Sequence, residues 1–406
     1  MRPVFRLISL ACLLSTAFVA ATRADELKFK TEEIDASLKV GYAVALVDVN
    51  SDGRPDIVVV DTQRVIWFEN PTWKLHTMIS GATQRDNVCI APHDMDGDGQ
   101  IDFALGAGWR GFNTTDPGTV QWLTRGESPA DPWIVRAIGE EPSVHRVRWA
   151  NVDDDDELEL VVVPLLGRGT TPPDFDERPV RILAYDIPAD PAQDRWPMRV
   201  LNEELHVAHN GWPTDLDQDG RTDLLIASFE GVSLLTRSGD GGWSRKLIGS
   251  GNQESSPSRG TSEIKHGRLR GGGDYLATIE PWHGFQVVVY TPPGDDAAEM
   301  WQRRVLDDQL KWGHAVWCAN LDGDEDEELI IGVRDTLTDD AQSGLRIYDP
   351  PASDAAESKW SRQLVDPGGV AIEDLAVADL NNDGRADVVA VGRQTHNVRI
   401  YWNEGR

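Results

Sequence analysis

A short acidic pattern, lost in the fifth of its seven copies, recurs along the chain, and it constrains the possible folds more than any other feature of the sequence. Its second copy, DMDGDGQID from Asp94, places aspartates at positions 1, 3, 5 and 9 and glycine at position 6. The other copies begin at Asp48, Asn151, Asp215, Arg268, Asn320 and Asp379. Because the copies are about 45–65 residues apart, each belongs to a repeated structural unit rather than to an isolated loop.

Every repeat has the same order of elements. An apolar segment runs into the acidic loop, a second apolar segment leaves it, and a third follows, such as RVIWFEN or VRIYWNEG. In six repeats a fourth segment opens on a tryptophan: Trp73, Trp133, Trp196, Trp243, Trp301 and Trp360. Short apolar segments separated by turns, repeated in groups of four, predict the four-stranded blades of a β-propeller.

The two ends of the chain complete the pattern. The seventh repeat stops after its third segment, at VRIYWNEGR, and LKFKTEEID near the N-terminus resembles a fourth strand without partners. We therefore predict an all-β fold: a seven-bladed β-propeller of four-stranded antiparallel blades, formed by one domain of residues 25–406. In this fold the N-terminal strand joins the last blade and closes the ring.

Residues 1–24 are expected to be a signal peptide, since two positive charges in MRPVFR precede a short apolar run and Ala24 offers a small residue for cleavage. No second apolar run is long enough to span a membrane. The formal net charge of -29 argues against partners such as nucleic acid and anionic lipid, which attract clustered positive charge. We therefore expect an exported protein, either periplasmic or secreted.

The acidic loops offer the ligands that calcium prefers, which are about six to eight hard oxygens. Four loops carry the full set with glycine at position 6: Asp48, Asn50, Asp52 and Asp56; Asp94, Asp96, Asp98 and Asp102; Asp215, Asp217, Asp219 and Asp223; Asp379, Asn381, Asp383 and Asp387. Two loops carry a partial set without that glycine, and whether they bind calcium stays open: Asn151, Asp153, Asp155 and Glu159; Asn320, Asp322, Asp324 and Glu328. The fifth repeat has lost the pattern.

The spacing D-x-[DN]-x-D-G-x-x-D resembles the FG-GAP/VCBS repeat family, which is also seen in the propeller of integrin α-subunits. The resemblance implies that these loops hold calcium in a structural role and not in catalysis. The alternative is that the loops are solvated hairpins without an ion. We expect several structural calcium ions, each of which cancels local repulsion and stabilises a hairpin.

A second set of residues, mostly polar, lies six positions before the acidic loops: Tyr42, Val88, His145, His209, His314 and Glu373. In the fifth repeat, which has lost the loop pattern, the register is loose and the equivalent residue is Gly260, Ser262 or Glu263. Three of the nine histidines fall at this one offset. Since the first strands of the blades converge on the axis of a propeller, these side chains are expected to meet at one mouth of the central channel. We call that side the top face.

Residues from the connecting segments should join them on the top face, among them His283 in EPWHG, Arg168 and Arg334. Two interpretations remain open. The first is a metal or acid–base site for a polar ligand such as a sugar, since imidazole binds divalent transition metals and transfers protons near neutral pH. The second is a solvated channel without chemistry.

The segments HNGWPTDLD, EPWHG and WGHAVWCANLD are distantly similar to the propeller domain of aldos-2-ulose dehydratases. That resemblance implies a carbohydrate lyase or dehydratase that removes water from a keto-sugar by β-elimination. It implies His145, His209 and His314 as ligands of a divalent transition metal or as the base, and Arg168 or Arg334 as substrate clamps. Glu373, His283 and Tyr42 complete the set of candidate catalytic residues. The alternative is a non-catalytic module that binds a glycan or an extracellular protein.

Overall fold

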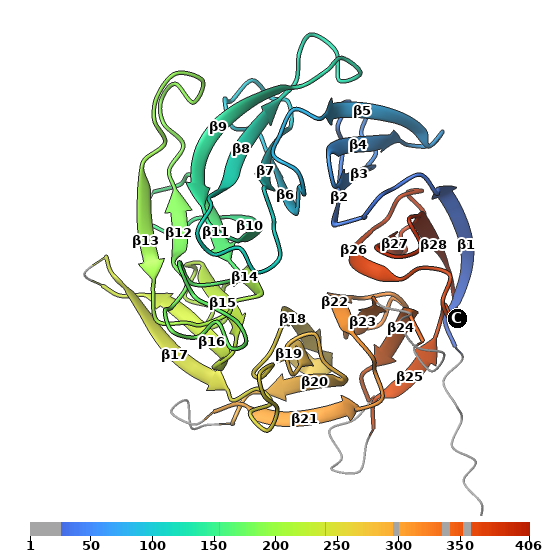
Figure 1. Ribbon diagram of the computed structural model, residues 1–406. Helices are drawn as coiled ribbons and strands as arrows, with labels where there is room; N and C mark the ends of the chain where they lie inside the picture. The colour runs from blue at the N-terminus through green and yellow to red at the C-terminus, as the bar shows by residue number, and fades with distance from the viewer. Residues whose placement is uncertain (1–25, 154, 240, 295–299, 335–341, 352–358) are drawn as a thin grey trace, which may run out of the picture.

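The computed structural model describes residues 26–153, 155–239, 241–294, 300–334, 342–351 and 359–406, so the segment expected to be a signal peptide lies outside the described residues. In the described part, seven four-stranded antiparallel sheets stand around a central axis (Figure 1). The predicted seven-bladed propeller is therefore confirmed. No helix among the described residues is long and apolar enough to cross a membrane.

The first strand of each blade is the innermost and the fourth is the outermost. Blade one contains β2 (Ala43–Val47), β3 (Asp56–Asp61), β4 (Arg64–Glu69) and β5 (Lys74–Ser80). Blade two contains β6 (Cys89–His93), β7 (Asp102–Ala107), β8 (Gly118–Thr124) and β9 (Ile134–Glu141). Blade three contains β10 (Val144–Ala150), β11 (Glu159–Pro164), β12 (Ile182–Tyr185) and β13 (Met198–Asn202). Blade four contains β14 (Asn210–Thr214), β15 (Asp223–Ser228), β16 (Gly231–Arg237) and β17 (Trp243–Gly249).

The remaining three blades repeat this order. Blade five contains β18 (Glu263–Leu269), β19 (Gly273–Glu280), β20 (Gln286–Thr291) and β21 (Gln302–Asp307), with a 3₁₀ turn, η1 (Arg270–Gly272), between its first two strands. Blade six contains β22 (Gly313–Ala319), β23 (Glu328–Val333), β24 (Gly344–Asp349) and β25 (Ser361–Leu364). Blade seven contains β26 (Ile372–Ala378), β27 (Asp387–Gly392), β28 (Val398–Gly405) and β1 (Lys28–Asp35).

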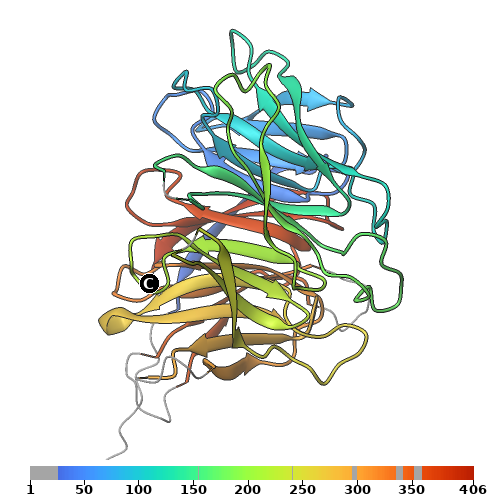
Figure 2. The ribbon, with the colours of Figure 1, turned by 90° about the vertical axis from the view of Figure 1, so that its left-hand side faces the viewer.

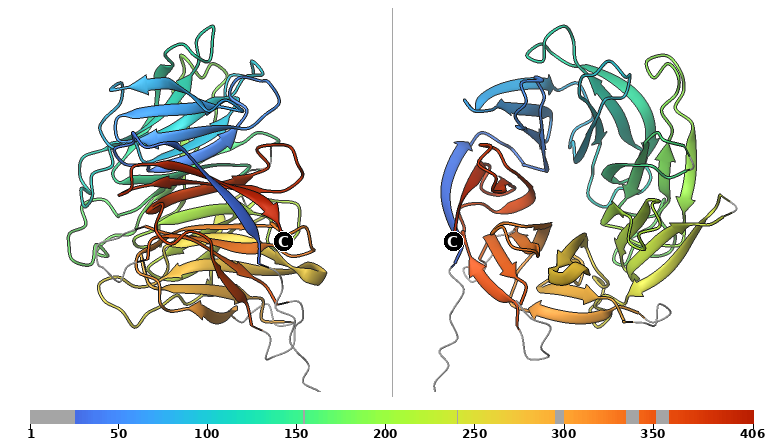
Figure 3. Two further views of the ribbon diagram at one scale, coloured as in Figure 1. Left: turned by 90° about the vertical axis from the view of Figure 1, so that its right-hand side faces the viewer. Right: turned by 180° about the vertical axis from the view of Figure 1, so that it is seen from behind.

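The ring closes as predicted. β1, from the N-terminal end of the chain, pairs antiparallel with β28 as the fourth strand of blade seven, and Phe29 lies opposite Asn403 (Figure 3, right). Trp402 donates a hydrogen bond from Nε1 to Glu32 at 2.8 Å across this pair. β1 covers the edge that β28 would otherwise present to solvent and becomes the outer strand of the blade, like the fourth strands of the other six.

The core consists of apolar layers between neighbouring blades. β3 is buried at every position, and its alternating side chains face opposite neighbours. Val58 packs in a cluster with Phe103 of blade two, whereas Val59 packs in a cluster with Ile400 of blade seven. Strands that are covered on both faces need continuous apolar runs, which explains the Val- and Ile-rich second strands.

The connections separate into two faces of the ring, as the side view in Figure 2 shows. All the acidic loops join a first strand to a second strand, so they lie together on one face, which we call the loop face. The innermost strands begin at the opposite, top face, where the residues that precede the loops by six positions lie.

Candidate functional site

The four complete acidic loops share one shape. The carboxylate at position 1 accepts hydrogen bonds from the backbone amides of positions 5 and 6; Asp48 accepts them from Asp52 at 3.1 Å and Gly53 at 2.7 Å. The same pair of bonds recurs at Asp94, Asp215 and Asp379. The glycine at position 6 has a φ of 82–87° in these loops, a conformation that favours glycine.

The side chains of these loops form groups of oxygen atoms. Residues at positions 3 and 5 accept hydrogen bonds from amides two positions further on, as Asp96 and Asp98 do. The buried carboxylate at position 9 accepts one from the amide of position 2; Asp102 does so from Met95 at 3.2 Å. Oxygen atoms of Asp94, Asp96 and Asp102 lie within 4.8 Å of one another.

Ionising the position 9 carboxyl groups costs free energy in the folded protein. Burial, and then the neighbouring carboxylates, raises their pKa to about 6 in Asp56, Asp223 and Asp387 and to about 7 in Asp102. Crowded hard oxygens that repel one another are a donor set that fits calcium.

The two partial loops differ, because an arginine lies among their carboxylates. In the third repeat, Nη2 of Arg199 lies 2.6 Å from Asp153, 3.7 Å from Glu159 and 3.1 Å from Asp186. In the sixth repeat, the guanidinium of Arg406 contacts Asp322, lies 2.7 Å from Asp349 and lies 4.0 Å from Glu328. In each case the guanidinium lies among three carboxylates whose oxygens are close enough together to hold a metal ion. In the fifth repeat, His266 bonds Asp274 at 2.9 Å in place of the lost pattern.

The layer of histidines at the top face is held by backbone carbonyl groups of the next blade. Nδ1 of His145 donates to the carbonyl of His209 at 2.8 Å, and Nδ1 of His209 donates to that of Ser262 at 3.0 Å. Nδ1 of His314 donates in the same way to Glu373. These bonds identify Ser262 as the equivalent residue of the fifth repeat. Because a carbonyl only accepts, each Nδ1 carries the proton and each Nε2 keeps its lone pair.

The first strands are irregular where this layer lies. The pairing register shifts between Val144 and Arg146, between Gly313 and Ala315, and between Ile372 and Asp374. His145, His314 and Glu373 therefore each occupy a β-bulge. A bulge redirects a side chain out of the regular alternation of a strand, which is a common feature next to functional sites.

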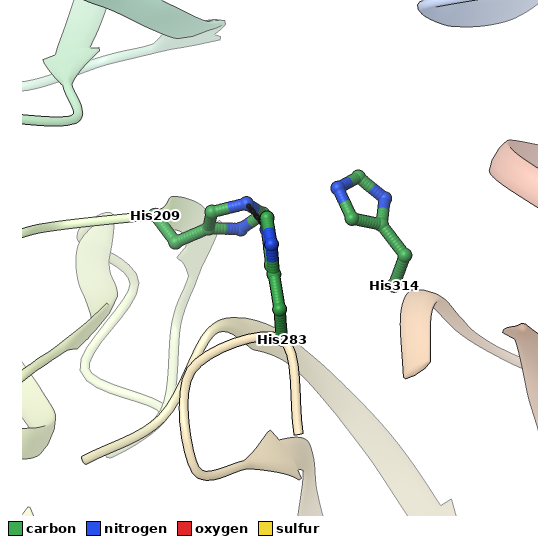
Figure 4. Close-up of side chains that lie close together, drawn as sticks. All are labelled: His209, His283 and His314. Carbon is green, nitrogen blue, oxygen red and sulfur yellow. Dashed lines mark hydrogen bonds between the residues drawn. The ribbon is translucent and has the colours of Figure 1, made fainter. Parts of the chain in front are cut away.

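A pocket of about 620 Å³ opens at this end of the channel. His314 and His283, from the loop between β19 and β20, line it, and the fully buried His209 lies beside them, so that histidines from three blades converge (Figure 4). Nε2 of His283 lies 2.7 Å from Nε2 of His209, and its ring centroid lies 4.9 Å from that of His314. One ring nitrogen from each of the three lies within 4.8 Å of the others.

These imidazoles are neutral at physiological pH. Burial lowers the pKa of His209, His283 and His314 well below the ordinary value, and nearby positive groups such as Arg334 lower it further. Three neutral imidazoles with convergent nitrogen atoms are a donor set that fits a divalent transition metal.

His145 lines the same pocket but is not a member of this group of three. Its ring packs against Trp109 with centroids 5.2 Å apart, and Nη1 of Arg146 lies 3.3 Å from both ring nitrogens. The structure thus groups His283, rather than His145, with the other two histidines.

The structure places only one of the two arginines that were predicted to clamp the substrate at the pocket. Arg168 is absent from the pocket lining, because its guanidinium makes a two-bonded pair with the buried carboxylate of Glu141, at 2.8 Å from Nε. The structure therefore does not bring Arg168 to the pocket. Arg334 does line the pocket, and its Nε lies 3.6 Å from Glu373, which also pairs with Arg393 at 2.8 Å.

Tyr42 lines the pocket on the side of blade one. Its hydroxyl donates to Asp86 at 3.4 Å, and the Arg393 guanidinium lies 5.5 Å from its ring centre. Burial and then Asp86 raise the pKa of Tyr42 to about 12, so its phenol keeps the proton at neutral pH.

An aromatic rim surrounds the pocket, and the sequence reasoning missed part of it. Trp109, Phe112, Phe175, Trp282 and Trp312 line the opening, and Phe112 and Trp312 are 68% and 43% exposed. The only sequence signal for Trp312 is its place two residues before His314. Arg146, also missed, follows His145 directly and so lies one level deeper in the channel.

Comparisons with known proteins agree with the fold and with both predicted resemblances. An FG-GAP-like repeat model matches residues 48–105, which defines the class of repeat. The model of the aldos-2-ulose dehydratase β-propeller domain matches residues 117–293. The aldos-2-ulose dehydratase of Phanerodontia chrysosporium is 28% identical over 291 residues, which is 66% of this chain and 31% of the relative. The match thus spans about a third of the relative's length.

Solved structures share the fold at low identity. BBS1N, in its complex with ARL6DN, is 12% identical and superposes with a TM-score of 0.54 over 93% of this chain and 96% of that one. An Agrocybe aegerita lectin is also 12% identical, with a TM-score of 0.50 over 81% of each chain. At this identity the likeness shows the propeller fold alone.

Proposed function

We propose that this chain is an exported, calcium-stabilised β-propeller whose top pocket is the site of a metal-assisted carbohydrate lyase or dehydratase. The observation that carries the proposal is the convergence of His209, His283 and His314 at a pocket that His283 and His314 line. The similarity to the aldos-2-ulose dehydratase of Phanerodontia chrysosporium supports a keto-sugar as substrate. The four complete acidic loops would hold calcium in a structural role.

The three histidines would hold a divalent transition metal through their ring nitrogens. When bound, such an ion polarises a carbonyl oxygen and makes the neighbouring C–H bond more acidic. Backbone carbonyls hold Nδ1 of His209 and His314, which fixes the two rings and leaves Nε2 of His209 facing Nε2 of His283.

The other pocket residues supply the proton transfers. His145 would act as the base: Nδ1 donates to a carbonyl, so the lone pair of Nε2 accepts the proton from the carbon beside the substrate carbonyl. The electron pair of that C–H bond forms the new double bond, and the C–O bond at the next carbon breaks. Tyr42, which keeps its phenol proton, would protonate the departing hydroxyl to water.

The aromatic rim and the charged wall would hold the sugar. Trp109 and Trp282 offer apolar faces of the kind that pack against sugar rings. Arg334, Arg393 and Glu373 form a linked set of charged groups beside the histidines, suited to hydrogen bonds with hydroxyl groups.

The test is a double variant, His209→Ala with His314→Ala, compared with wild type and with His76→Ala. His76 lies on the outer strand β5 and bonds Glu69, so it is a matched control far from the pocket. We expect wild type and control to retain about one equivalent of transition metal and to convert neutral keto-sugars with loss of water, and the double variant to do neither. A wild-type protein without transition metal and without turnover refutes the enzyme proposal.

The exposed rim residues favour a second function, a non-catalytic module that binds a glycan or an extracellular protein. Phe112 stacks on Phe175 with centroids 5.4 Å apart and remains largely in contact with solvent. Glycan-array binding that is lost in Trp312→Ala, with no conversion of any sugar by wild type, would support this function instead.

A further inference from the structure

We infer that the central channel holds a second binding site, on the loop-face side of the histidine pocket, for a small organic carboxylate. The first observation is a separate chamber of about 360 Å³. Its lining comes mainly from the innermost strands, and Arg146 and Val88 line both this chamber and the histidine pocket. Arg146 thus stands between the two spaces.

The shape of the chamber follows from an uneven distribution of side-chain size around the ring. Blades one, two and seven present small side chains to it, such as Ala45, Ala91 and Ala376. Blades three to six present long ones, among them Arg148, Trp212, Lys265 and Trp317. The long side chains do not fill the space that the alanines leave open.

The charges of the chamber favour an anion. Its lining contains three cations, Arg146, Arg148 and Lys265, and two carboxylates, Glu263 and Asp374. This local excess of positive charge lies inside a chain with a formal net charge of -29. A buried site with that sign attracts an anion from solution more strongly than the surface around it does.

The carboxylates already have partners. Glu263 pairs with Arg146 at 3.3 Å and accepts a hydrogen bond from Asn210. Asp374 accepts one from the backbone amide of Val44 at 3.1 Å. Two nitrogen donors in the chamber lining, in contrast, lack a hydrogen-bond acceptor in the described part of the chain. Nε of Arg148 has no hydrogen-bond partner, and within the described residues Lys265 makes neither a hydrogen bond nor a salt bridge.

Lys265 is 5% exposed, and its amino group lies 3.5 Å from the ring centre of Trp212 and 4.8 Å from that of Trp317. Two aromatic faces replace only part of the hydration of an ammonium group. Burial, and then the neighbouring Arg148, lowers the pKa of Lys265 to about 7. Carboxylate oxygens between Lys265 and Arg148 would supply the missing acceptors.

Access comes from the loop face. The last residues of β2, β14 and β22 are half-buried, whereas their first residues are buried. A solute therefore reaches the chamber without passing the histidines. The walls formed by Trp149, Trp212 and Trp317 favour an organic body over an inorganic ion, so the ligand class is a small carboxylate such as a sugar acid.

The test is titration calorimetry with glucuronate, acetate, inorganic phosphate and the neutral sugar glucose. We expect wild type to bind glucuronate at one site per chain, acetate more weakly, and glucose not at all. Lys265→Met and Ala45→Leu should each weaken glucuronate binding at least tenfold, the first by removing the cation and the second by filling the chamber. Because Ala45→Leu removes no charge, it keeps the test valid if Lys265→Met fails to fold.

Two controls locate the site. Lys74→Met removes an exposed lysine on β5 and should leave glucuronate binding unchanged. His314→Ala, at a residue that lines the histidine pocket and not the chamber, should also keep this binding, which separates the chamber from the proposed active site. Wild type that binds none of the carboxylates, or phosphate alone, overturns the inference, as does undiminished glucuronate binding by Ala45→Leu.

Discussion

Asp102→Asn should stabilise the calcium-free protein, although it removes a proposed calcium ligand. The Asp102 side chain is buried beside other carboxylates, and its pKa is about 7 in the folded chain against an ordinary value of 3.8. That difference corresponds to a cost of about 4 kcal/mol for ionising Asp102 in the folded, calcium-free protein. Asparagine keeps the oxygen that accepts from the Met95 amide and avoids this cost.

The sign follows from proton binding. Between about pH 4 and pH 7 folded Asp102 still holds the proton that the unfolded chain has lost, so the stability of the calcium-free wild type falls as pH rises through this window. At pH 8, in the presence of a chelator, we expect the variant to be more stable by about 2–4 kcal/mol. At pH 5 this difference in stability between the variant and wild type should be less than half of its value at pH 8.

Calcium should reverse part of this gain. An ion at a hundredfold excess over its Kd stabilises the folded protein by about 2.7 kcal/mol per site. The difference in the free energy of unfolding between Asp102→Asn and wild type should decrease by that amount when calcium is added. Urea unfolding at pH 5 and pH 8, with and without calcium, gives the free energy of unfolding under all four conditions. Asp116→Asn, on an exposed loop, serves as control. A variant that is less stable than wild type at pH 8 without calcium refutes the reasoning, and a gap unaffected by calcium shows that loop two holds no ion.

Three further predictions follow from the same contacts. Equilibrium dialysis should find four calcium ions per chain and not six, because Arg199 and Arg406 lie among the carboxylates of the partial loops. Six bound ions would contradict the idea that these arginines take the place of calcium there. Arg199→Gln should cost about 1–3 kcal/mol in chemical unfolding, since it leaves the Asp153 and Asp186 carboxylates without a cation, and an unchanged midpoint would show that the ion pair is immaterial. Leu27→Ala should cost about 2–4 kcal/mol, because this side chain is 5% exposed and precedes the closing strand; a loss below 1 kcal/mol would mean that this end of the chain does not hold the ring closed.

The sequence alone was enough to predict the fold because the repeat is local. Each acidic loop marks the junction of a first and a second strand, and seven junctions with one order of elements permit one closed arrangement of blades. The missing fourth strand of the last repeat and the unpaired strand around Phe29 then predict the closure that the β1–β28 pair shows. Equal offsets on equivalent strands also become equal heights along the axis, and for that reason His209 and His314 meet.

Only the tertiary structure decided which side chains join them. His283 comes from a loop outside the repeat pattern, and a φ of 51° at that residue helps to direct it into the pocket. Arg168 lies on a comparable connection, yet the buried carboxylate of Glu141 holds it elsewhere. Arg199 is about 40 residues beyond the loop whose acids it neutralises, on a strand that pairing brings back beside them. Repetition fixes the positions of strands, because backbone pairing is periodic, whereas the direction of a loop side chain depends on the partners that one particular packing supplies.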